Sequence, residues 1–175
     1  SNNTALNDLW CADNQLTSLD VSNNTALTVL DIGGDPYTNL DVSKNTALTY
    51  LGIRSTQLTS LDVSSNTALE HLYVNDNQLT SLDVSSNTAL ITLWCQDNQL
   101  TYLNMRNGIT DALNGIGPED TDCNATNNSL TCIEVLDPDW STENWTSAKE
   151  NIDAGVTFAY ICGVDVDGVS TYNNN

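Results

Sequence analysis

Basic residues are scarce in this chain of 175 residues. Four Lys and Arg residues stand against 23 Asp and Glu residues, so the formal net charge is −19. A charge of this sign repels nucleic acid and anionic membrane surfaces, and it favours cations and cationic or neutral partners. No apolar run approaches the ~18 residues that a transmembrane helix requires. We therefore expect neither nucleic-acid binding nor direct insertion into a membrane.

Histidine is scarcer still, because His71 is the only one. A zinc centre built from several histidines is therefore excluded. No Gly-x-Ser-x-Gly segment is present to place a nucleophilic serine on a strained turn. The carboxylates are abundant, but no pattern isolates a pair for acid–base work. The sequence predicts a protein that is not an enzyme.

Leucine, by contrast, recurs with a strict period of 21 residues. Five units begin at Leu6, Leu27, Leu48, Leu69 and Leu90. The first half of each unit has the form Leu-x-x-Leu-x-(Cys/Ile/Val)-x-x-Asn-x-Leu. The second half starts at the last leucine of the first half and has the form Leu-x-x-Leu-x-Val, with Met105 in place of valine in unit five. A period in this range predicts a solenoid, in which each unit buries its apolar side against its neighbours.

The first half-unit resembles the core motif of the leucine-rich repeat family, and the whole 21-residue unit is similar to the IRREKO-type subclass of bacterial leucine-rich repeats. The resemblance covers residues 6–107. Unit two departs from the motif at Asp35 and Tyr37, and unit three departs at Thr56. The resemblance implies a mainly β solenoid with two short parallel strands per turn, and binding of a protein partner.

The alternation of apolar and polar residues supports the same architecture. In Leu9-Trp10-Cys11 and in Leu19-Asp20-Val21, two apolar side chains flank one polar or aromatic side chain, which is typical of short strands. Asparagines recur at the expected bends, where their amides can satisfy unpaired backbone groups. These columns are Asn14, Asn77, Asn98 and Asn24, Asn45, Asn66, Asn87.

Residues 108–175 break the period. We expect residues 1–107 to be the solenoid, 108–163 a C-terminal capping segment and 164–175 a polar tail or linker. The run from Leu130 to Ile133, with Trp145, Phe158 and Cys162, resembles the caps that follow such repeats in secreted proteins of the Bacteroidetes. The pattern predicts a degenerate strand over 130–135, a short helix capped by Ser141 or Thr142, and a final strand over 156–162. Half of a calcium-loop pattern at 165–168 is interpreted as a turn.

The five cysteines do not form one framework. Cys11 and Cys95 lie in an inward column and are interpreted as small core residues. Cys132 and Cys162 lie outside the repeats and are the candidates for a disulfide, which would indicate an oxidising compartment. The alternative is that both are buried thiols.

The two strands of each unit differ in how much their outward residues vary. The second strand repeats Thr, Asp and Ser almost unchanged, whereas the first strand differs from unit to unit and exposes four aromatic side chains. A surface that fits an irregular partner must vary, so we place a ligand-binding site on the first strands. Its candidate residues are Trp10, Asp31, Tyr50, Arg54, His71, Tyr73, Trp94 and Gln96. The alternative is that the aromatic rings only brace neighbouring strands.

The repeated carboxylates of the second strand are a separate question. They are Asp20, Asp41, Asp62 and Asp83. Neighbouring hydroxyl groups can offset their mutual repulsion, which makes a structural role the favoured interpretation. The alternative is a row of weak Ca²⁺ sites, although stacked single carboxylates offer too few oxygens for a good cage. No other cofactor is expected.

Three functions are compatible with these features. The first is a recognition module, secreted or on the outer cell surface, that binds a protein partner through the first-strand face. The second is a carbohydrate-binding module or appendage of a polysaccharide-degrading system, and the third is a structural spacer in an adhesin. The sequence begins in the middle of the repeat pattern, so we expect it to be part of a larger multidomain chain.

Overall fold

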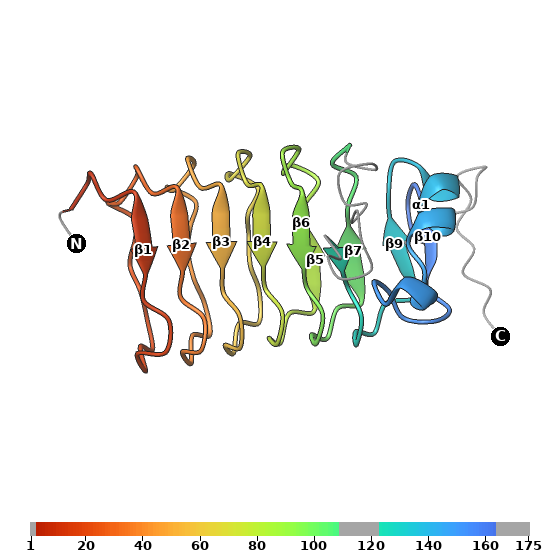
Figure 1. Ribbon diagram of the computed structural model, residues 1–175, viewed down its shortest axis with the longest axis horizontal. Helices are drawn as coiled ribbons and strands as arrows, with labels where there is room; N and C mark the ends of the chain where they lie inside the picture. Colours follow the sequence, from red (N-terminus) through yellow and green to blue (C-terminus); the bar gives the residue numbers. More distant parts are fainter. Residues whose placement is uncertain (1–2, 109–122, 164–175) are drawn as a thin grey trace.

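The computed structural model describes residues 3–108 and 123–163. It shows an elongated solenoid, in which similar turns of the chain stack along one axis (Figure 1). Each turn contributes one strand to a six-stranded parallel sheet. Its strands are β1 (Asp8–Trp10), β2 (Val29–Asp31), β3 (Tyr50–Gly52), β4 (His71–Tyr73), β6 (Thr92–Trp94) and β8 (Cys123–Asn124). Corresponding residues of successive units pair in register, as in Leu9 with Leu30 and Leu30 with Leu51. The predicted solenoid is confirmed.

A second parallel sheet lies behind the first. It contains four strands, in the spatial order β10, β9, β7, β5. Their bounds are β5 (Ser81–Asp83), β7 (Tyr102–Asn104), β9 (Cys132–Glu134) and β10 (Thr157–Ala159). In the first three units the corresponding segments, residues 19–21, 40–42 and 61–63, carry the same motif but are not assigned as strands. The second ladder therefore begins only in the fourth unit.

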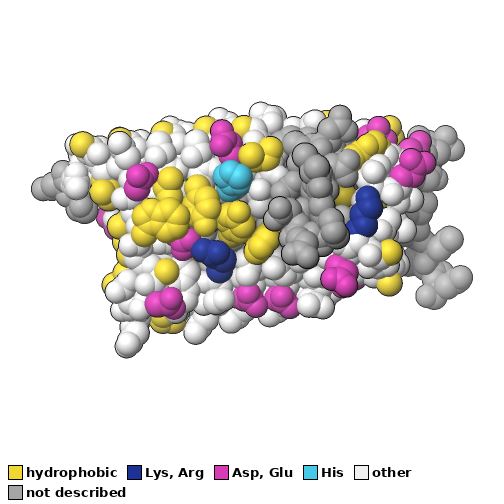
Figure 2. All heavy atoms as spheres, in the orientation of Figure 1, with side chains coloured by type: hydrophobic (Ala, Val, Ile, Leu, Met, Phe, Trp, Pro, Cys, Tyr) yellow, Lys and Arg dark blue, Asp and Glu magenta, His cyan; other side chains and the backbone are white. Residues whose placement is uncertain are grey.

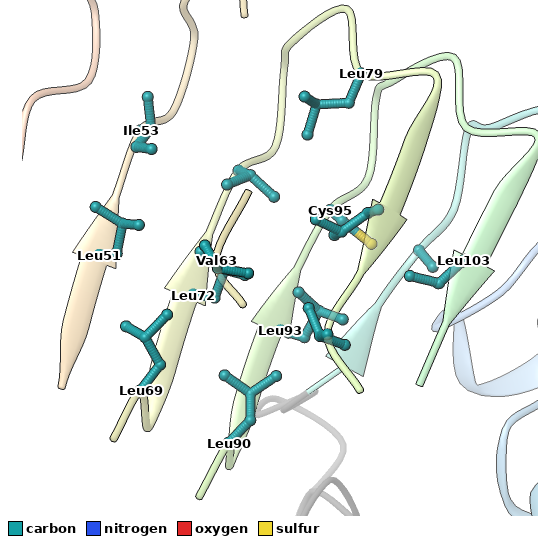
Figure 3. Packing of buried hydrophobic residues seen from close by; sticks show 14 of the residues in the cluster. Leu51, Ile53, Val63, Leu69, Leu72, Leu79, Leu90, Leu93, Cys95 and Leu103 are labelled. Atoms are coloured by element: carbon teal, nitrogen blue, oxygen red, sulfur yellow. The ribbon is translucent and has the colours of Figure 1, made fainter. Parts of the chain in front are cut away.

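The repeated leucines, isoleucines and valines fill the space between the two sides of the solenoid. Figure 3 shows side chains of successive units stacked in columns, with Leu51, Leu72 and Leu93 in one of them. All three are completely buried. Full burial of a leucine side chain contributes roughly 2 kcal/mol, so the repetition of the motif supplies a continuous core. Cys95 and Cys123 are buried cysteines of the core, while Cys11 is half-buried near the first turn.

The asparagines at the bends bind backbone carbonyls, as expected. The Asn45 amide donates to the carbonyls of Val21 at 3.1 Å and Asn24 at 2.9 Å. Asn66 and Asn87 repeat the same two bonds one and two units later. Because each amide bonds to the preceding unit, the column ties successive turns together. A role of these side chains in ligand binding is not compatible with their burial.

The C-terminal end contains the predicted strands and one helix. Strands β9 and β10 continue the second sheet, and Figure 1 shows α1 (Pro138–Asn144) packed beyond them. The expected cap at Ser141 or Thr142 is wrong: Asp137 accepts a hydrogen bond from the backbone N–H of Trp140, and Pro138 opens the helix. Proline at this position lacks only an N–H that has no helical partner. A single 3₁₀ turn (Ser147–Lys149) follows.

Cys132 and Cys162 form a disulfide, as the sequence predicted, with Cα atoms 5.9 Å apart. The expected tail over 164–175 and its half calcium-loop pattern lie outside the described residues. Within the described ranges, no helix has the length and apolar character needed to cross a bilayer.

Candidate ligand-binding face

The outward side chains of the first sheet form rows, because equivalent residues of successive units pair in register. One row runs through Trp10, Asp31, Gly52, Tyr73 and Trp94. A parallel row, two residues earlier in each unit, contains Tyr50, His71 and Thr92. Figure 2 shows the resulting group of hydrophobic side chains over the first units, with the single histidine at one border and a basic side chain at the other.

Four aromatic rings are in contact along this face, and we call Trp10, Tyr50, Tyr73 and Trp94 the aromatic strip. The Tyr50 ring lies 5.6 Å from Trp10 and 5.3 Å from Tyr73, and Tyr73 meets Trp94 at 5.3 Å in an edge-to-face arrangement. The expected contact between Tyr73 and Trp94 is therefore present. Trp10 is 64% exposed, whereas the other three residues are less exposed and half-buried.

Tyr50 closes the gap that unit two leaves in the row. Unit two offers Asp31 and unit three offers Gly52 where the flanking units have aromatic rings. A β-carbon on Gly52 would lie 2.9 Å from Asp31 Oδ2 and 3.2 Å from Tyr50 Cε1. The missing side chain is therefore what allows Tyr50 to lean across and contact both Trp10 and Tyr73.

Asp31 joins Tyr50 to Arg54 beneath the strip. Its Oδ2 accepts hydrogen bonds from the Tyr50 hydroxyl at 3.1 Å and from Arg54 Nη2 at 2.6 Å. Asp31 is 3% exposed, so its charge is compensated by the guanidinium rather than by water. Asp31 was expected as an outward contact residue, but in the structure its side chain is buried and holds its neighbours in place.

Arg54 has two partners on this face. Besides its ion pair with Asp31, its guanidinium lies over the Tyr73 ring, 5.4 Å from the ring centroid. Burial raises the pKa of Tyr50 to about 12; Arg54 opposes this rise and Asp31 adds to it. The Tyr50 hydroxyl therefore stays protonated at neutral pH and remains a donor to Asp31. The strip is fixed by polar contacts as well as by ring packing.

His71 and Gln96 border the same surface. His71 Nδ1 lies 3.0 Å from Thr92 Oγ1, and the His71 ring is 6.3 Å from the Tyr50 ring. Gln96 lies two residues beyond Trp94, and its Oε1 is buried with no hydrogen-bond partner in the part of the chain that is described. The fold thus brings all eight predicted residues onto one face, although they differ in exposure.

The aspartates of the second strands are held by their own turns. In Asp20, Asp41, Asp62 and Asp83, Oδ1 accepts the backbone N–H of the serine two residues later at 2.9 Å. Hydrogen bonds from the serines lower the pKa of the first three carboxyl groups. Burial alone would raise the pKa of Asp83, but bonds from Ser85 and Asn104 lower it overall. Within residues 3–108 and 123–163, no three acidic, histidine or cysteine side chains converge as metal ligands.

The structure also shows a hollow that the sequence did not predict. It borders the aromatic strip, has a volume of about 290 Å³ and is lined by residues that include Asp13, Gly33, Gly34, Arg54 and Asn75. The only available signal was the pair Gly33-Gly34 at positions where other units carry side chains. That pair also fits an ordinary turn, so the sequence alone does not predict a hollow there.

Neither a family model nor a curated protein matches the sequence. Among solved structures, the functional domain of InlJ from Listeria monocytogenes is similar at 30% identity and a TM-score of 0.57, over 75% of this chain and 39% of that one. An internalin, InlF, from the same organism is similar at 30% identity and a TM-score of 0.53, over 56% of this chain and 31% of that one.

The fold is that of a leucine-rich repeat solenoid. The ectodomain of the plant receptor kinase GASSHO1/SCHENGEN3 from Arabidopsis thaliana shares it over 89% of this chain and 22% of that one, at 19% identity and a TM-score of 0.55. That ectodomain was solved in complex with Casparian strip integrity factor 2. This chain spans 39% and 31% of the length of the two internalin structures. The similarity to bacterial leucine-rich repeat proteins suggests a protein-interaction module.

Proposed function

We propose that this chain is an extracellular recognition module that binds a protein partner through the aromatic strip. The observation that carries the proposal is the strip itself: four rings in contact on the one face where the repeats differ, with Trp10 64% exposed. Aromatic and arginine side chains dominate binding energy in protein interfaces. Arg54 lies over the Tyr73 ring of the strip, so aromatic and arginine side chains are present together on this face.

Bracing of neighbouring strands does not account for the whole strip. Tyr73 and Trp94 are in adjacent strands and half-buried, as bracing residues would be. Trp10 contacts Tyr50 from two units away, and most of its surface faces solvent. An exposed tryptophan gains little from this position in the free protein, so its placement supports binding.

The ring geometry favours a protein over a carbohydrate partner. Sugar rings stack flat on exposed aromatic faces, so a linear glycan requires successive rings of similar orientation. Here the planes of Tyr73 and Trp94 are 82° apart, and Tyr50 is tilted by 37° from Trp10 and 41° from Tyr73. An irregular surface of this kind is suited to a protein with side chains of different shapes.

The proposed location rests on the disulfide and on the structural neighbours. A bond between Cys132 and Cys162 persists in oxidising compartments. Two of the similar structures are bacterial internalins and one is a receptor ectodomain. We place the protein outside the cytoplasm, either secreted or on the outer cell surface, with residues 1–107 as the binding solenoid and 108–163 as its cap.

The test is a screen of displayed extracellular protein domains, with a glycan array beside it. Wild-type protein is compared with a Trp10→Ala/Trp94→Ala variant and with Tyr160→Ala, which removes a 58% exposed aromatic side chain in the cap. We expect a protein ligand whose Kd rises at least about 30-fold in the double variant, the loss typical of hot-spot residues, and is unchanged in the Tyr160 variant. Protein ligands insensitive to the double substitution, or a glycan that depends on Trp10, would overturn the proposal.

A further inference from the structure

We propose that the hollow beside the aromatic strip receives a lysine or arginine side chain of the protein partner. This inference rests on the proposed function, since it assigns the chemistry of one contact within that interface. The hollow lies along the bends of the first four units, and its lining includes Ala12, Asp13, Gly33, Arg54 and Asn75. Its volume of about 290 Å³ is at the small end of ligand sites, which suits one side chain rather than a larger ligand.

Two adjacent glycines allow the neighbouring turns to approach closely at the hollow. A β-carbon on Gly33 would lie 2.8 Å from the carbonyl oxygen of Arg54, and one on Gly34 would lie 2.0 Å from Asp13 Oδ1. Gly34 also has a φ of +80°, which disfavours other residues. Units three and four carry side chains at these places, namely Arg54-Ser55 and Asn75-Asp76. This close approach is therefore specific to unit two, and it holds the Asp13 carboxylate directly against Gly34 in the lining of the hollow.

The charges around the hollow favour a cation. Its lining contains the carboxylates of Asp13 and Asp31 but only one basic side chain, Arg54. Arg54 is already paired with Asp31 at 2.6 Å, which leaves the Asp13 charge in excess. No donor in the described part of the chain bonds to the Asp13 carboxylate. The whole protein carries a net charge of −19, so an anionic group would approach against a repulsive field.

A neutral acceptor lies in the same lining. Asn75 is 9% exposed, its Nδ2 donates to Asp76, and its Oδ1 is buried with no partner among residues 3–108 and 123–163. A buried acceptor without a donor is costly, by about 1–3 kcal/mol. Lysine offers three donors and arginine five, so either can bond to a carboxylate and an amide oxygen together.

The aromatic strip provides the apolar part of the contact. Trp10 ends β1 two residues before Ala12, which belongs to the lining of the hollow. An aliphatic stem can pack along the exposed Trp10 ring while its charged end reaches Asp13. A cation close to a tryptophan face gains further attraction from the ring electrons.

The test is an NMR titration of ¹⁵N-labelled protein with capped tripeptides, Ac-Gly-X-Gly-NH₂, in which X is lysine, arginine, norleucine or glutamate. We expect the lysine and arginine peptides to shift the amides of Ala12, Gly33 and Gly34, and the norleucine and glutamate peptides to leave them unchanged. Asp13→Asn is expected to weaken the lysine peptide at least fivefold. Asparagine accepts the left-handed conformation of Asp13 (φ 58°) without strain, so the variant keeps its fold.

Asp97→Asn is the matched control. Asp97 is exposed, has a φ of 56° and occupies the equivalent position of unit five, where Thr126 and Asn127 of the next turn take the place of the glycine pair. It is expected to leave the titration unchanged. Equal shifts with norleucine, or no effect of Asp13→Asn, would refute the inference. So would binding of the glutamate peptide that is lost in Arg54→Gln.

The two proposals can fail separately. A protein ligand that depends on Trp10 but not on Asp13 would refute only the basic-side-chain contact. Lysine peptides that bind at the hollow, without any protein ligand sensitive to the strip, would refute only the proposed function.

Discussion

Asp35 is a position where the structure predicts that a natural residue lowers stability. It occupies the asparagine position of unit two and is 1% exposed. Its Oδ1 accepts the backbone N–H of Asn14 at 2.7 Å and also that of Gln15. Its Oδ2 is buried with no hydrogen-bond partner in the described residues. Oδ1 thus accepts two backbone N–H groups, as an amide oxygen could, whereas Oδ2 lacks a donor.

The other units show what an amide would gain there. The Asn98 amide oxygen accepts the N–H of Leu79 at 2.9 Å, and its Nδ2 donates to the carbonyls of Val74 and Cys95 at 2.9 and 3.1 Å. These carbonyls lie 24 and 3 residues before Asn98. By the same spacing, Asp35→Asn places an N–H group near the carbonyls of Cys11 and Ile32, and it removes a buried negative charge.

We expect Asp35→Asn to stabilise the fold by about 2 kcal/mol, the usual cost of one buried polar group without a partner. In a domain of this size that corresponds to a rise in Tm of roughly 4–8 °C. Circular dichroism during thermal and urea unfolding at pH 7 measures both quantities. The matched control is Asn98→Asp, which creates the same defect in unit five and is expected to lower stability by a similar amount. An unchanged or lower Tm for Asp35→Asn would refute the reasoning.

Two further predictions concern acid and reduction. Hydrogen bonds from Ser64 hold the folded-state pKa of Asp62 below its ordinary value of 3.8; its contribution to stability is therefore present above about pH 4 and lost as the pH falls through the folded pKa. Asp62→Asn should flatten the decline of the unfolding free energy below pH 4, and an unchanged decline in a urea series would contradict this. The Cys132–Cys162 disulfide closes a loop with a sequence separation of 30, so replacing both cysteines with serine should cost ~3–4 kcal/mol. Equal urea midpoints for the double variant and the wild type would exclude that contribution.

The periodic part of the fold was predictable because each unit repeats the same buried apolar positions and the same asparagine hydrogen bonds. Leu51 and Leu72 are buried where the motif requires, and Asn45 and Asn66 bind the preceding carbonyls. The sequence could not locate the start of the helix at Pro138, because Asp137 and Ser141 are both acceptable caps. Only the packing of the chain after β9 decides between them.

The candidate face was predictable as a set of residues but not as an arrangement. Variation among units selected the first strands, and the register of these strands brings the predicted residues together. The burial of Asp31 was not foreseeable, since alternation alone places it outward. Its position depends on Arg54 and on the missing side chain of Gly52, which both belong to the next unit, so the motif of a single unit does not reveal it.

The asparagine column has a consequence for how this protein can change in length. Asn45 bonds to carbonyls 21 and 24 residues earlier, and Asn66 and Asn87 do the same. Losing or adding one residue within a turn would shift every later amide away from its carbonyl and turn leucines outward. Whole turns, however, can be duplicated or removed without disturbing either partner. We expect such proteins to vary by multiples of one unit, so that a binding face grows or shrinks in discrete rows.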